Sequence, residues 1–300
     1  MNVTILGNNS ALPAFGRHPT AQALSLTGET ILLDCGEGTQ VQMQHYGIKW
    51  GKINHIFISH MHGDHYFGLF GLVNSMSLLG RTEPLHLYAP PALKGIIDQI
   101  TIAADSHLAY EFYFHPLLEG TNILVDNDRF RVTAFGVEHR ITCHGFLIEQ
   151  KTKGRKLLPE RCAEFHIPVD FYDKLKMGQD YMHADGTIIK NELLTADGLS
   201  PTRYAYCADT RFTESFMDVI RGADTIYHEC TYLQEDEVRA TLRFHSTTAQ
   251  AARIAVIAGA KQLLLGHFSS RYKELDAFQA EAAAIFPNVH VTVEGTTYEI

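Results

Sequence analysis

Short apolar runs alternate with longer amphipathic segments through most of the chain, which is typical of strands separated by helices. After an N-terminal strand, we expect strands at residues 21–26, 30–33, 53–58, 85–89 and 130–137 and helices at 39–46, 67–79 and 91–104. The segment 67–79 is too apolar for an exposed helix. We therefore expect it to pack between a sheet and an outer layer.

The pattern resumes after residue 203. We expect strands at 204–207, 225–228 and 262–265 and helices at 212–220 and 247–258. Strands and helices that alternate in this way indicate an α/β fold. The resumption suggests two similar halves that face each other, at about residues 1–150 and 204–300, within a single domain spanning 1–300.

Residues 151–203 differ from both halves. They are polar, rich in Lys and interrupted by Pro159, Pro168 and Pro201. Roughly 50 residues are too many for an ordinary connection, so we expect a projecting functional element. A disordered insert is the alternative, which we disfavour because the segment has apolar residues to bury. These residues are Phe165, Ile167, Phe171, Tyr172 and Leu175.

Composition indicates the cellular compartment of the protein. No segment reaches the roughly 18 consecutive apolar residues of a membrane span, and the first residues lack the pattern of a secretory leader. The five cysteines are odd in number, widely spaced and form no Cys-x-x-Cys pair, which favours a reducing compartment. We expect a cytoplasmic protein with no membrane partner.

The net charge of −9 argues mildly against a nucleic-acid partner. Charge is local, however, and basic residues crowd into the start of the insert: Lys151, Lys153, Arg155, Lys156 and Arg161. Two bound divalent cations would also add about +4 at a site. The acidic balance therefore does not exclude RNA.

A dense group of candidate metal ligands directly follows an expected strand. His60, His62, Asp64 and His65 lie within six residues. Residues i and i+2 of an extended segment project to one side, so His60 and His62 can share one ion. Gly63 frees the turn that brings the other two toward a second ion. Imidazole and carboxylate ligands suit zinc and would accept Mn or Fe. A polar surface loop is the alternative interpretation.

Further ligands must come from distant parts of the chain. A two-metal site needs about three protein ligands per ion and usually a bridging carboxylate. His139, Asp209 and His267 qualify because each follows a short apolar strand. We expect the first ion to be bound by His60, His62 and His139. We expect the second ion to be bound by Asp64, His65 and His267, and Asp209 to bridge the two ions.

The chain resembles the metallo-β-lactamase superfamily and, within it, the ribonuclease Z (tRNA 3′-processing endonuclease) family. The His-x-His-x-Asp-His cluster marks the superfamily, and the segments around His245 and His267 narrow the resemblance to ribonuclease Z. The matching segments occur in the family's order: residues 34–40, 59–71, 137–140, 208–210, 228–231, 245–248 and 266–272.

The resemblance implies a fold, an activity and partners. The fold is a four-layer αββα metallo-β-lactamase sandwich with a projecting, flexible arm, formed here by residues 151–203. The activity is zinc-dependent removal of the 3′ trailer from precursor tRNA by two-metal hydrolysis, which leaves a 3′-hydroxyl on the tRNA. In bacterial members the arm grips the tRNA elbow, and in a homodimer the arm of one subunit serves the active site of the other.

The resemblance also suggests catalytic roles. The family assigns Asp64 the role of base toward the attacking water, beside its role as a ligand. His245 is the candidate acid that protonates the leaving 3′ oxygen, and Glu229 would hold its imidazole in the right tautomer. The alternative for His245 is a polar residue at a helix start. We expect Asp34 to support the ligands and His228 to be structural.

The chain departs from the family pattern in the arm, where Val169-Asp170 stands in place of a usual Gly-Pro pair, and in the loop 13–18. Other functions stay open at this point. A related hydrolase of small phosphodiesters or aryl esters would share the ligands but would not need the insert. A true β-lactamase is disfavoured because its second metal commonly uses Cys where this chain has Asp209. The full set of ligands argues against a noncatalytic RNA-binding module.

Overall fold

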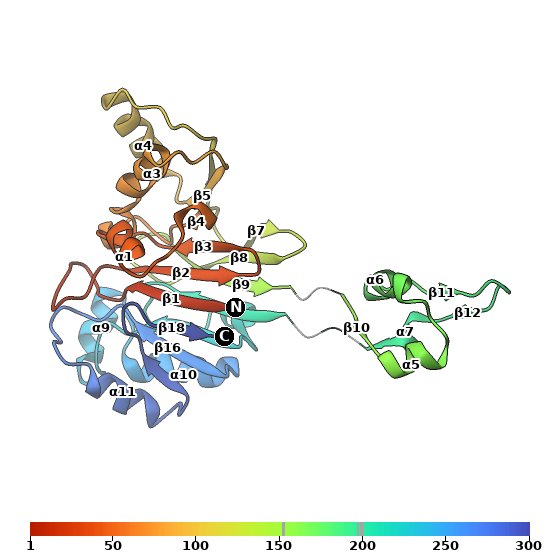
Figure 1. Cartoon of the computed structure of the whole chain (residues 1–300). Coiled ribbons are helices and arrows are strands. Elements are labelled where there is room, and N and C mark those ends of the chain that lie inside the picture. Colours follow the sequence, from red (N-terminus) through yellow and green to blue (C-terminus); the bar gives the residue numbers. More distant parts are fainter. Residues whose placement is uncertain (152–153, 197, 199–200) are drawn as a thin grey trace.

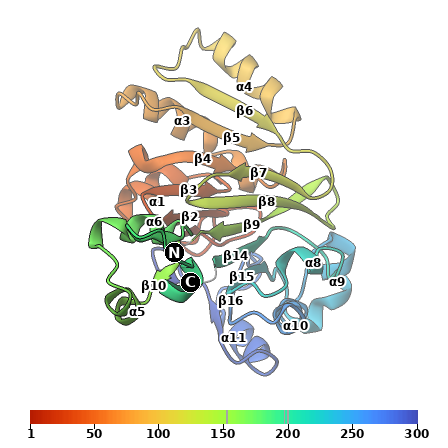
Figure 2. The same ribbon diagram turned by 90° about the vertical axis from the view of Figure 1, so that its right-hand side faces the viewer.

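The computed structural model describes residues 1–151, 154–196, 198 and 201–300. Two large mixed sheets face each other, and residues 154–196 form a smaller unit that projects from one end of this body (Figure 1). Helices cover the outer faces of the sheets (Figure 2). The predicted α/β class and four-layer αββα sandwich are confirmed.

The first sheet combines antiparallel and parallel strands. Its strands are β1 (Asn2–Gly7), β2 (Ala21–Leu26), β3 (Glu29–Leu33), β4 (Ile53–Phe57), β5 (Leu85–Ala89), β6 (Phe112–Pro116) and β18 (Thr297–Glu299). β18, β1, β2 and β3 pair antiparallel in that order, and β3, β4, β5 and β6 pair in parallel.

The second sheet repeats this order of pairing. Its strands are β7 (Asn122–Asp126), β8 (Phe130–Val137), β9 (Cys143–Gln150), β14 (Thr202–Cys207), β15 (Thr225–Glu229), β16 (Gln262–Gly266) and β17 (Val289–Val291). β7, β8, β9 and β14 pair antiparallel, and β14, β15, β16 and β17 pair in parallel. Each sheet takes strands from both sides of the insert.

The outer layers are helical. The helices of the body are α1 (Thr39–His45), α2 (Gly63–Tyr66), α3 (Leu69–Leu78), α4 (Ala92–Ala103), α8 (Met217–Ile220), α9 (Glu237–Arg243), α10 (Thr248–Ala258) and α11 (Asp276–Ala283), with short 3-10 turns η1 (Trp50–Lys52) and η3 (Gln234–Asp236). α1, α3 and α4 share an apolar core with the first sheet, and α8, α10 and α11 share one with the second. Between the sheets lie Val3, Phe57, Phe146, Tyr206 and Tyr227.

Most predicted strands and helices are confirmed within two residues, but the helix at 212–220 is wrong. Residues 212–216 form bends and turns, and α8 begins only at Met217. The Thr213 hydroxyl donates to Oε1 of Glu138 (3.0 Å) and accepts from the Ser215 N–H (3.2 Å). Such side-chain bonds compete with the backbone bonds of a helix.

The predicted environment of the helix at 67–79 is also wrong. Leu72 and Met76 of α3 are buried against the sheet, whereas Leu78 and Leu79 are 80% and 72% exposed. In the part of the chain that the structure describes, no further layer covers this face. α3 itself belongs to the outer layer, because a single layer of helices is enough to bury the apolar outer face of the sheet.

Residues 154–196 fold around an apolar core of their own. The elements are β10 (Lys156–Leu157), α5 (Pro159–Glu164), η2 (Val169–Phe171), α6 (Tyr172–Lys176), β11 (Tyr181–Met182), β12 (Ile188–Ile189), α7 (Asn191–Leu194) and β13 (Thr195–Ala196). The apolar residues expected to be buried belong to this core or pack against it: Phe165, Ile167, Phe171, Tyr172 and Leu175. Lys153, one of the basic residues noted above, lies outside the described residues.

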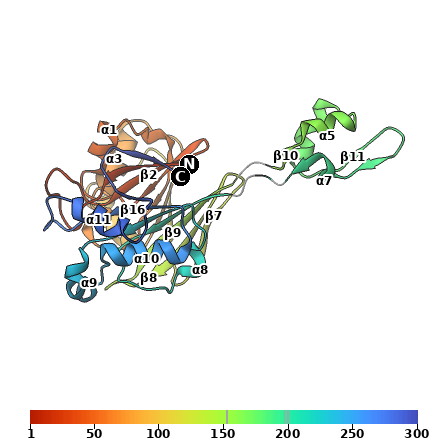
Figure 3. The same cartoon turned by 90° about the horizontal axis from the view of Figure 1, so that it is seen from below.

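This unit joins the body between the end of β9 and the start of β14. It therefore projects from the edge of the second sheet that is opposite to the carboxyl ends of β8 and β14 (Figures 1 and 3). Among the described helices, none is long and apolar enough to cross a membrane.

Candidate active site

The expected ligands meet at one edge of the sandwich, where strands of both sheets end. His60 follows β4, His139 follows β8, Asp209 follows β14 and His267 follows β16, each within three residues. β9 is antiparallel to both of its neighbours, and β14 to β16 are parallel, so β8, β14 and β16 end at the same edge. The strand-end position therefore brings these residues together.

The local His-x-His-x-Asp-His cluster bends at Gly63, the first residue of α2. His62 has an extended backbone before the helix (φ −83°, ψ 141°), and the first turn carries Asp64 and His65. The reason for glycine is space, because a Cβ at this position would overlap the Phe67 ring. Gly63 is absent from the residues with positive φ, so the expected role of backbone freedom at this turn is wrong.

The first group consists of imidazoles whose nitrogen atoms converge. Nδ1 of His62 lies 3.0 Å from Nε2 of His60 and 3.1 Å from Nε2 of His139. Oδ2 of Asp209 lies 3.7 and 3.9 Å from the same Nε2 atoms. These residues offer ligand atoms that all lie within 4.8 Å of one another.

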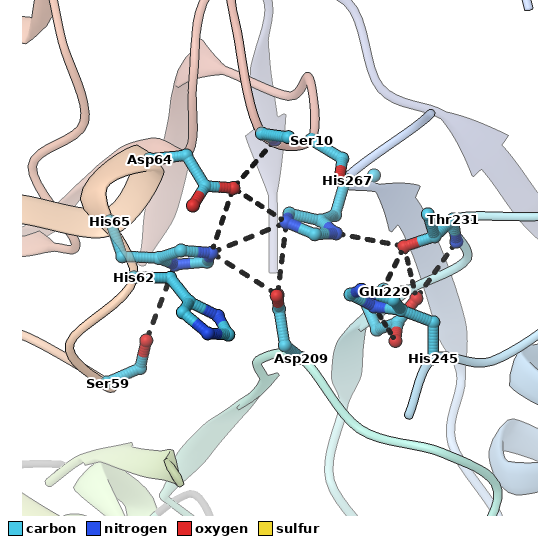
Figure 4. Close-up of polar contacts among 12 residues, drawn as sticks. Ser10, Ser59, His62, Asp64, His65, Asp209, Glu229, Thr231, His245 and His267 are labelled. Carbon is cyan, nitrogen blue, oxygen red and sulfur yellow. Dashed lines mark hydrogen bonds and ion pairs between the residues drawn. The ribbon is translucent and has the colours of Figure 1, made fainter. Parts of the chain in front are cut away.

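The second group contains Asp64, His65 and His267 (Figure 4). Nε2 of His65 lies 3.3 Å from Nε2 of His267, and Oδ2 of Asp64 lies 3.6 and 3.4 Å from these two atoms. Oδ1 of Asp209 lies 3.3 and 3.1 Å from the same nitrogens. Asp209 therefore lies between the groups, with one oxygen toward each.

This spacing fits divalent metal ions. Two ligands bound at about 2.0–2.1 Å in a tetrahedral arrangement are about 3.3 Å apart, close to the 3.0–3.3 Å between the imidazole nitrogens. Oδ1 of Asp209 is buried and, in the ranges that the structure describes, forms no hydrogen bond of good geometry, although Nε2 of His65 and of His267 lie 3.3 and 3.1 Å away. An unpaired buried carboxylate oxygen is costly, and a bound cation would offset that cost.

The charges of the site also favour a cation. Burial raises the pKa of Asp209, but His267 and His65 outweigh burial and hold the pKa well below its usual range. Burial lowers the pKa of His65, whereas Asp209, Asp64 and Asp34 raise it well above its usual value. Ionised buried carboxylates therefore attract positive charge to the space between the ligands.

A buried carboxylate supports the ligands that follow the first sheet. Asp34, directly after β3, accepts hydrogen bonds from Nδ1 of His65 (2.7 Å) and from the Ser59 hydroxyl (2.9 Å). The Ser59 oxygen lies 3.0 Å from Nδ1 of His60. Because the hydroxyl donates to Asp34, its lone pair accepts the imidazole proton, which leaves Nε2 of His60 free to bind metal. Asp34 has the supporting position expected for it.

Glu229 has the corresponding position at the end of β15. Its carboxylate accepts from Nδ1 of His245 (2.9 Å) and from the Thr231 hydroxyl (2.9 Å). The Thr231 oxygen lies 3.0 Å from Nδ1 of His267 (Figure 4). Each sheet thus supplies a carboxylate that holds one imidazole directly and a second one through a hydroxyl.

Left-handed backbone conformations of non-glycine residues concentrate at this site: Ala11 (φ 66°), Asp34 (φ 54°), Phe244 (φ 58°) and His267 (φ 62°). The Ala11 N–H donates to Oδ2 of Asp64 (2.7 Å), and the Phe244 carbonyl accepts from Nδ1 of His139 (2.9 Å). Such conformations cost on the order of 1–3 kcal/mol each and persist where surrounding contacts impose them. Here they aim two backbone groups at ligand side chains.

Known proteins resemble this chain over different extents. A family model described as Anti-Pycsar protein Apyc1 matches residues 1–152, which excludes the ligands after β14 and β16. Ribonuclease Z of Porphyromonas gingivalis is 41% identical over 95% of this chain and 94% of its own length. Ribonuclease Z of Bacteroides fragilis is 38% identical over 97% and 96% of the two chains.

The chain belongs to the ribonuclease Z family.

A ribonuclease Z is a metal-dependent endoribonuclease of the metallo-β-lactamase superfamily, and the predicted family and enzyme class are confirmed. The crystal structure of the short form of human tRNase Z aligns with a TM-score of 0.73 and 25% identity over 100% of this chain and 99% of that chain. YhfI of Bacillus subtilis, a metallo-β-lactamase fold protein, has a TM-score of 0.71 and 19% identity over 99% and 98%. The YhfI likeness shows the fold alone.

In this ribonuclease Z, both ligand groups line an open cavity of about 710 Å³. Other residues at the cavity include Phe67, Arg140, Tyr232, Leu242 and Arg243. Arg140 and Arg243 bring positive charge to this cavity.

His245 of the ribonuclease Z faces this cavity. Burial lowers its pKa, but Glu229 outweighs burial and raises the pKa of His245 to about 9. The ligand atoms of Asp209, His245 and His267 also lie within 4.8 Å of one another. Because Glu229 holds Nδ1 of His245, the raised pKa keeps a proton on this imidazole near neutral pH, which suits a proton donor that faces the cavity.

The structure brings together every residue predicted as a ligand and places His245 and Glu229 beside them. Other histidines lie outside the groups. Nε2 of His144 bonds the Leu118 carbonyl (3.1 Å), and Nδ1 of His228 bonds the Glu229 carbonyl (2.6 Å), which fits the structural position expected for His228.

Sequence reasoning missed several supporting groups. Ser59 and Thr231 stand beside predicted site residues in the segments that resemble the family, and a hydroxyl next to a strand-end carboxylate is a signal that would find them. The Tyr206 hydroxyl, which donates to Oδ2 of Asp34 (2.5 Å), lies 172 residues away in sequence. The Ala11 N–H and the Phe244 carbonyl belong to the backbone and leave no side-chain pattern.

Proposed function

We propose that this ribonuclease Z uses two zinc ions to hydrolyse precursor tRNA at its 3′ trailer, leaving a 3′-hydroxyl on the tRNA. The observation that carries the proposal is the pair of ligand groups that share Asp209 at an open cavity. When bound, two adjacent divalent cations supply Lewis acidity toward a phosphodiester and a lower pKa for the attacking water. Mn or Fe would suit the same donors.

Asp64 and His245 carry the proton transfers in this proposal. Asp64 orients the attacking water and accepts its proton, while the Ala11 N–H keeps one carboxylate oxygen in place. His245 gives its Nε2 proton to the leaving 3′ oxygen. Glu229 binds Nδ1 of His245, so the other ring nitrogen is the one available to substrate.

Residues 151–203 are proposed to bind the tRNA away from the cleavage site, at its elbow. This range contains nine Lys and Arg against eight Asp and Glu, so it is less basic as a whole than its first eleven residues suggest. Further along, Lys176 pairs with Asp173 (2.9 Å) and Lys190 with Asp180 (2.8 Å). At the start of the arm, Lys151 and Arg161 likewise pair with Asp126 and Glu164. The start still holds five basic residues against one acidic residue within residues 151–161, and this local excess suits phosphate.

A homodimer that shares its arms is the proposed assembly. The arm projects away from the body (Figure 3) and joins it at the edge opposite to the carboxyl ends of β8 and β14, which the predicted ligands follow. This position favours service to a partner's site over its own. Exposed apolar residues on α3 and α4, including Leu78, Leu79 and Ile102, provide a surface for a second copy. An apolar hollow of about 360 Å³ lies between the same helices.

Mixing an inactive variant with a binding-impaired variant tests the sharing of arms. One variant carries His65→Ala with an intact arm, and the other has a short Gly-Ser linker in place of residues 152–200 with an intact site. If arms act in trans, the mixture should cleave precursor tRNA better than either variant alone. Light scattering gives the mass of the wild type, and a monomer would contradict the assembly.

The reaction itself is tested with a 3′-extended precursor tRNA and zinc-loaded protein. We expect cleavage beside the discriminator nucleotide, its loss in His65→Ala, and mainly a higher KM in the arm-linker variant. Hydrolysis of an aryl phosphodiester without cleavage of precursor tRNA would move the protein to the small-ester hydrolases. RNA binding with no hydrolysis by fully loaded protein would indicate a noncatalytic module.

A cytoplasmic location is part of the same proposal. The cysteines at 35, 143, 162, 207 and 230 are all free and buried, which suits a reducing compartment.

A further inference from the structure

α9 is a helix with almost no contact to the core. Of its residues Glu237–Arg243, only Ala240 is buried in the structure as described. A surface helix usually buries an apolar stripe against the body. α9 is held mainly through its ends, where Asp236 accepts from the Tyr272 hydroxyl (2.5 Å) and the Phe244 carbonyl accepts from His139.

The outward face of α9 presents paired apolar and basic side chains. Val238 and Leu242 are 76% and 74% exposed and lie one helical turn apart. Arg239 and Arg243 form an adjacent exposed pair with the same spacing. These side chains line a hollow of about 470 Å³. A solvated helix has no need of two exposed aliphatic residues at this spacing.

The acidic residues of this hollow lie at its far end. Glu235 and Asp236 precede α9, and Asp236 is occupied by Tyr272 and by Nε of Arg239 (3.6 Å). Acidic groups at a helix start are common because they interact favourably with the helix dipole. The carboxyl-terminal half of α9 is therefore the part with free positive charge.

That half of α9 leads directly into the catalytic cavity. Leu242 and Arg243 line both the hollow and the cavity, and His245 follows two residues later. α9 lies at the end of the body away from the arm (Figures 1 and 3). A strand bound along α9 would therefore enter the cavity on the His245 side.

We propose that α9 binds the RNA strand that ends in the leaving 3′ oxygen, namely the acceptor end of the tRNA. The inference rests on the proposed function, in which His245 protonates that oxygen. The nucleotide bearing the oxygen must then lie beside His245, next to Leu242 and Arg243. The arginines bind backbone phosphates, and the aliphatic side chains contact ribose and base.

The test is a double variant, Leu242→Ala with Arg243→Gln. Its matched control is Val256→Ala with Arg253→Gln, an exposed aliphatic and basic pair on α10 that lines neither hollow. For precursor tRNA we expect KM to rise about tenfold in the α9 variant. The slope of log KM against log salt concentration should fall by about one, which corresponds to the loss of one phosphate contact. The control should match the wild type.

Other outcomes would overturn the inference. If the wild type cleaves precursor tRNA and the α9 variant does so with the same KM, α9 does not bind substrate. If the defect grows with trailer length, α9 binds the trailer and the strand assignment is wrong. If the variant also loses bound zinc, the substitutions act on the structure. A wild type that cleaves no tRNA would instead refute the proposed function.

Discussion

At the scale of residues, two hydroxyl groups connect buried carboxylates to ligand imidazoles. Ser59 and Thr231 are buried, and each hydroxyl donates to one carboxylate. Of the two imidazoles near each hydroxyl, the nearer ones are those of His60 and His267. A hydroxyl has one proton to donate and can accept another, so it fixes the tautomer of the histidine that it joins. Orientation of the ligands therefore depends on residues that never touch the metal.

Thr231→Val keeps the shape of the side chain but removes the hydroxyl. Nδ1 of His267 then loses its acceptor, and we expect the affinity for one of the two proposed zinc ions to fall about 10- to 100-fold. Competition with a chromophoric chelator measures this affinity. Thr231→Ser should bind zinc as the wild type does, and unchanged affinity in Thr231→Val would show that the hydroxyl does not orient His267.

Glu229→Gln should lower the pKa of His245 in the metal-free protein, because burial then acts without the opposing carboxylate. The wild-type pKa of about 9 exceeds the value of about 6.5 in an unfolded chain. Protonated His245 therefore stabilises the fold most below about pH 6.5, and this contribution is lost as the pH rises through about 9.

NMR titration of the His245 ring, with urea unfolding at several pH values, checks this expectation. The difference in unfolding free energy between the wild type and Glu229→Gln should narrow from pH 6.5 to pH 9. An identical titration of His245 in both proteins would contradict the assigned cause.

At the scale of elements, the metal-binding loop packs directly on the turn after β3. The Cys35 N–H donates to the His65 carbonyl (2.8 Å), and the Gly68 N–H donates to the Cys35 carbonyl (2.9 Å). A Cβ on Gly36 would overlap the Asp64 carbonyl oxygen. The turn and the ligand-bearing helix α2 therefore form one packed unit, in which backbone meets backbone.

Gly36→Ala should destabilise the protein by about 1–3 kcal/mol and weaken zinc binding, because the new methyl group must displace the loop that carries Asp64. Urea unfolding measures the first effect and zinc titration the second. Gly51→Ala is the matched control, since a Cβ there meets nothing within 4 Å. Equal unfolding free energies for the two variants would contradict the close packing.

At the scale of the whole molecule, the predicted ligands come from both sheets. His60 follows a strand of the first sheet, whereas Asp209 and His267 follow strands of the second. An ion held by these residues would join layers that otherwise contact each other through apolar side chains. It would also neutralise carboxylates that are buried at the same edge.

Removal of zinc should therefore lower the melting temperature of the whole body. An ion that binds only the folded state stabilises it by about 2.7 kcal/mol at a free concentration 100 times Kd. Calorimetry with excess chelator and with added zinc measures the shift, and His62→Ala should show a smaller one. Equal melting temperatures with and without zinc would contradict a link between the sheets.

Local patterns in the sequence predicted the α/β class, most of the elements and the strand-end positions of the candidate ligands, because each depends on near neighbours. The four-layer fold was implied by the family resemblance. Period-two and period-3.6 hydrophobicity report which face of a segment is buried. A polar residue directly after an apolar strand lies at the edge of a sheet, which is why His139, Asp209 and His267 were predicted as ligands. The resemblance then placed these residues within one family.

Tertiary structure alone decided how distant groups meet. Thr231 reaches His267 through the register of β15 and β16, and Tyr206 reaches Asp34 only because the two sheets face each other. Tertiary packing also decides which surfaces stay uncovered. It leaves Leu78 and the outward face of α9 exposed, and it sets the direction of the arm. A linear pattern cannot specify these contacts, because it records the burial of each residue but not the partner that buries it.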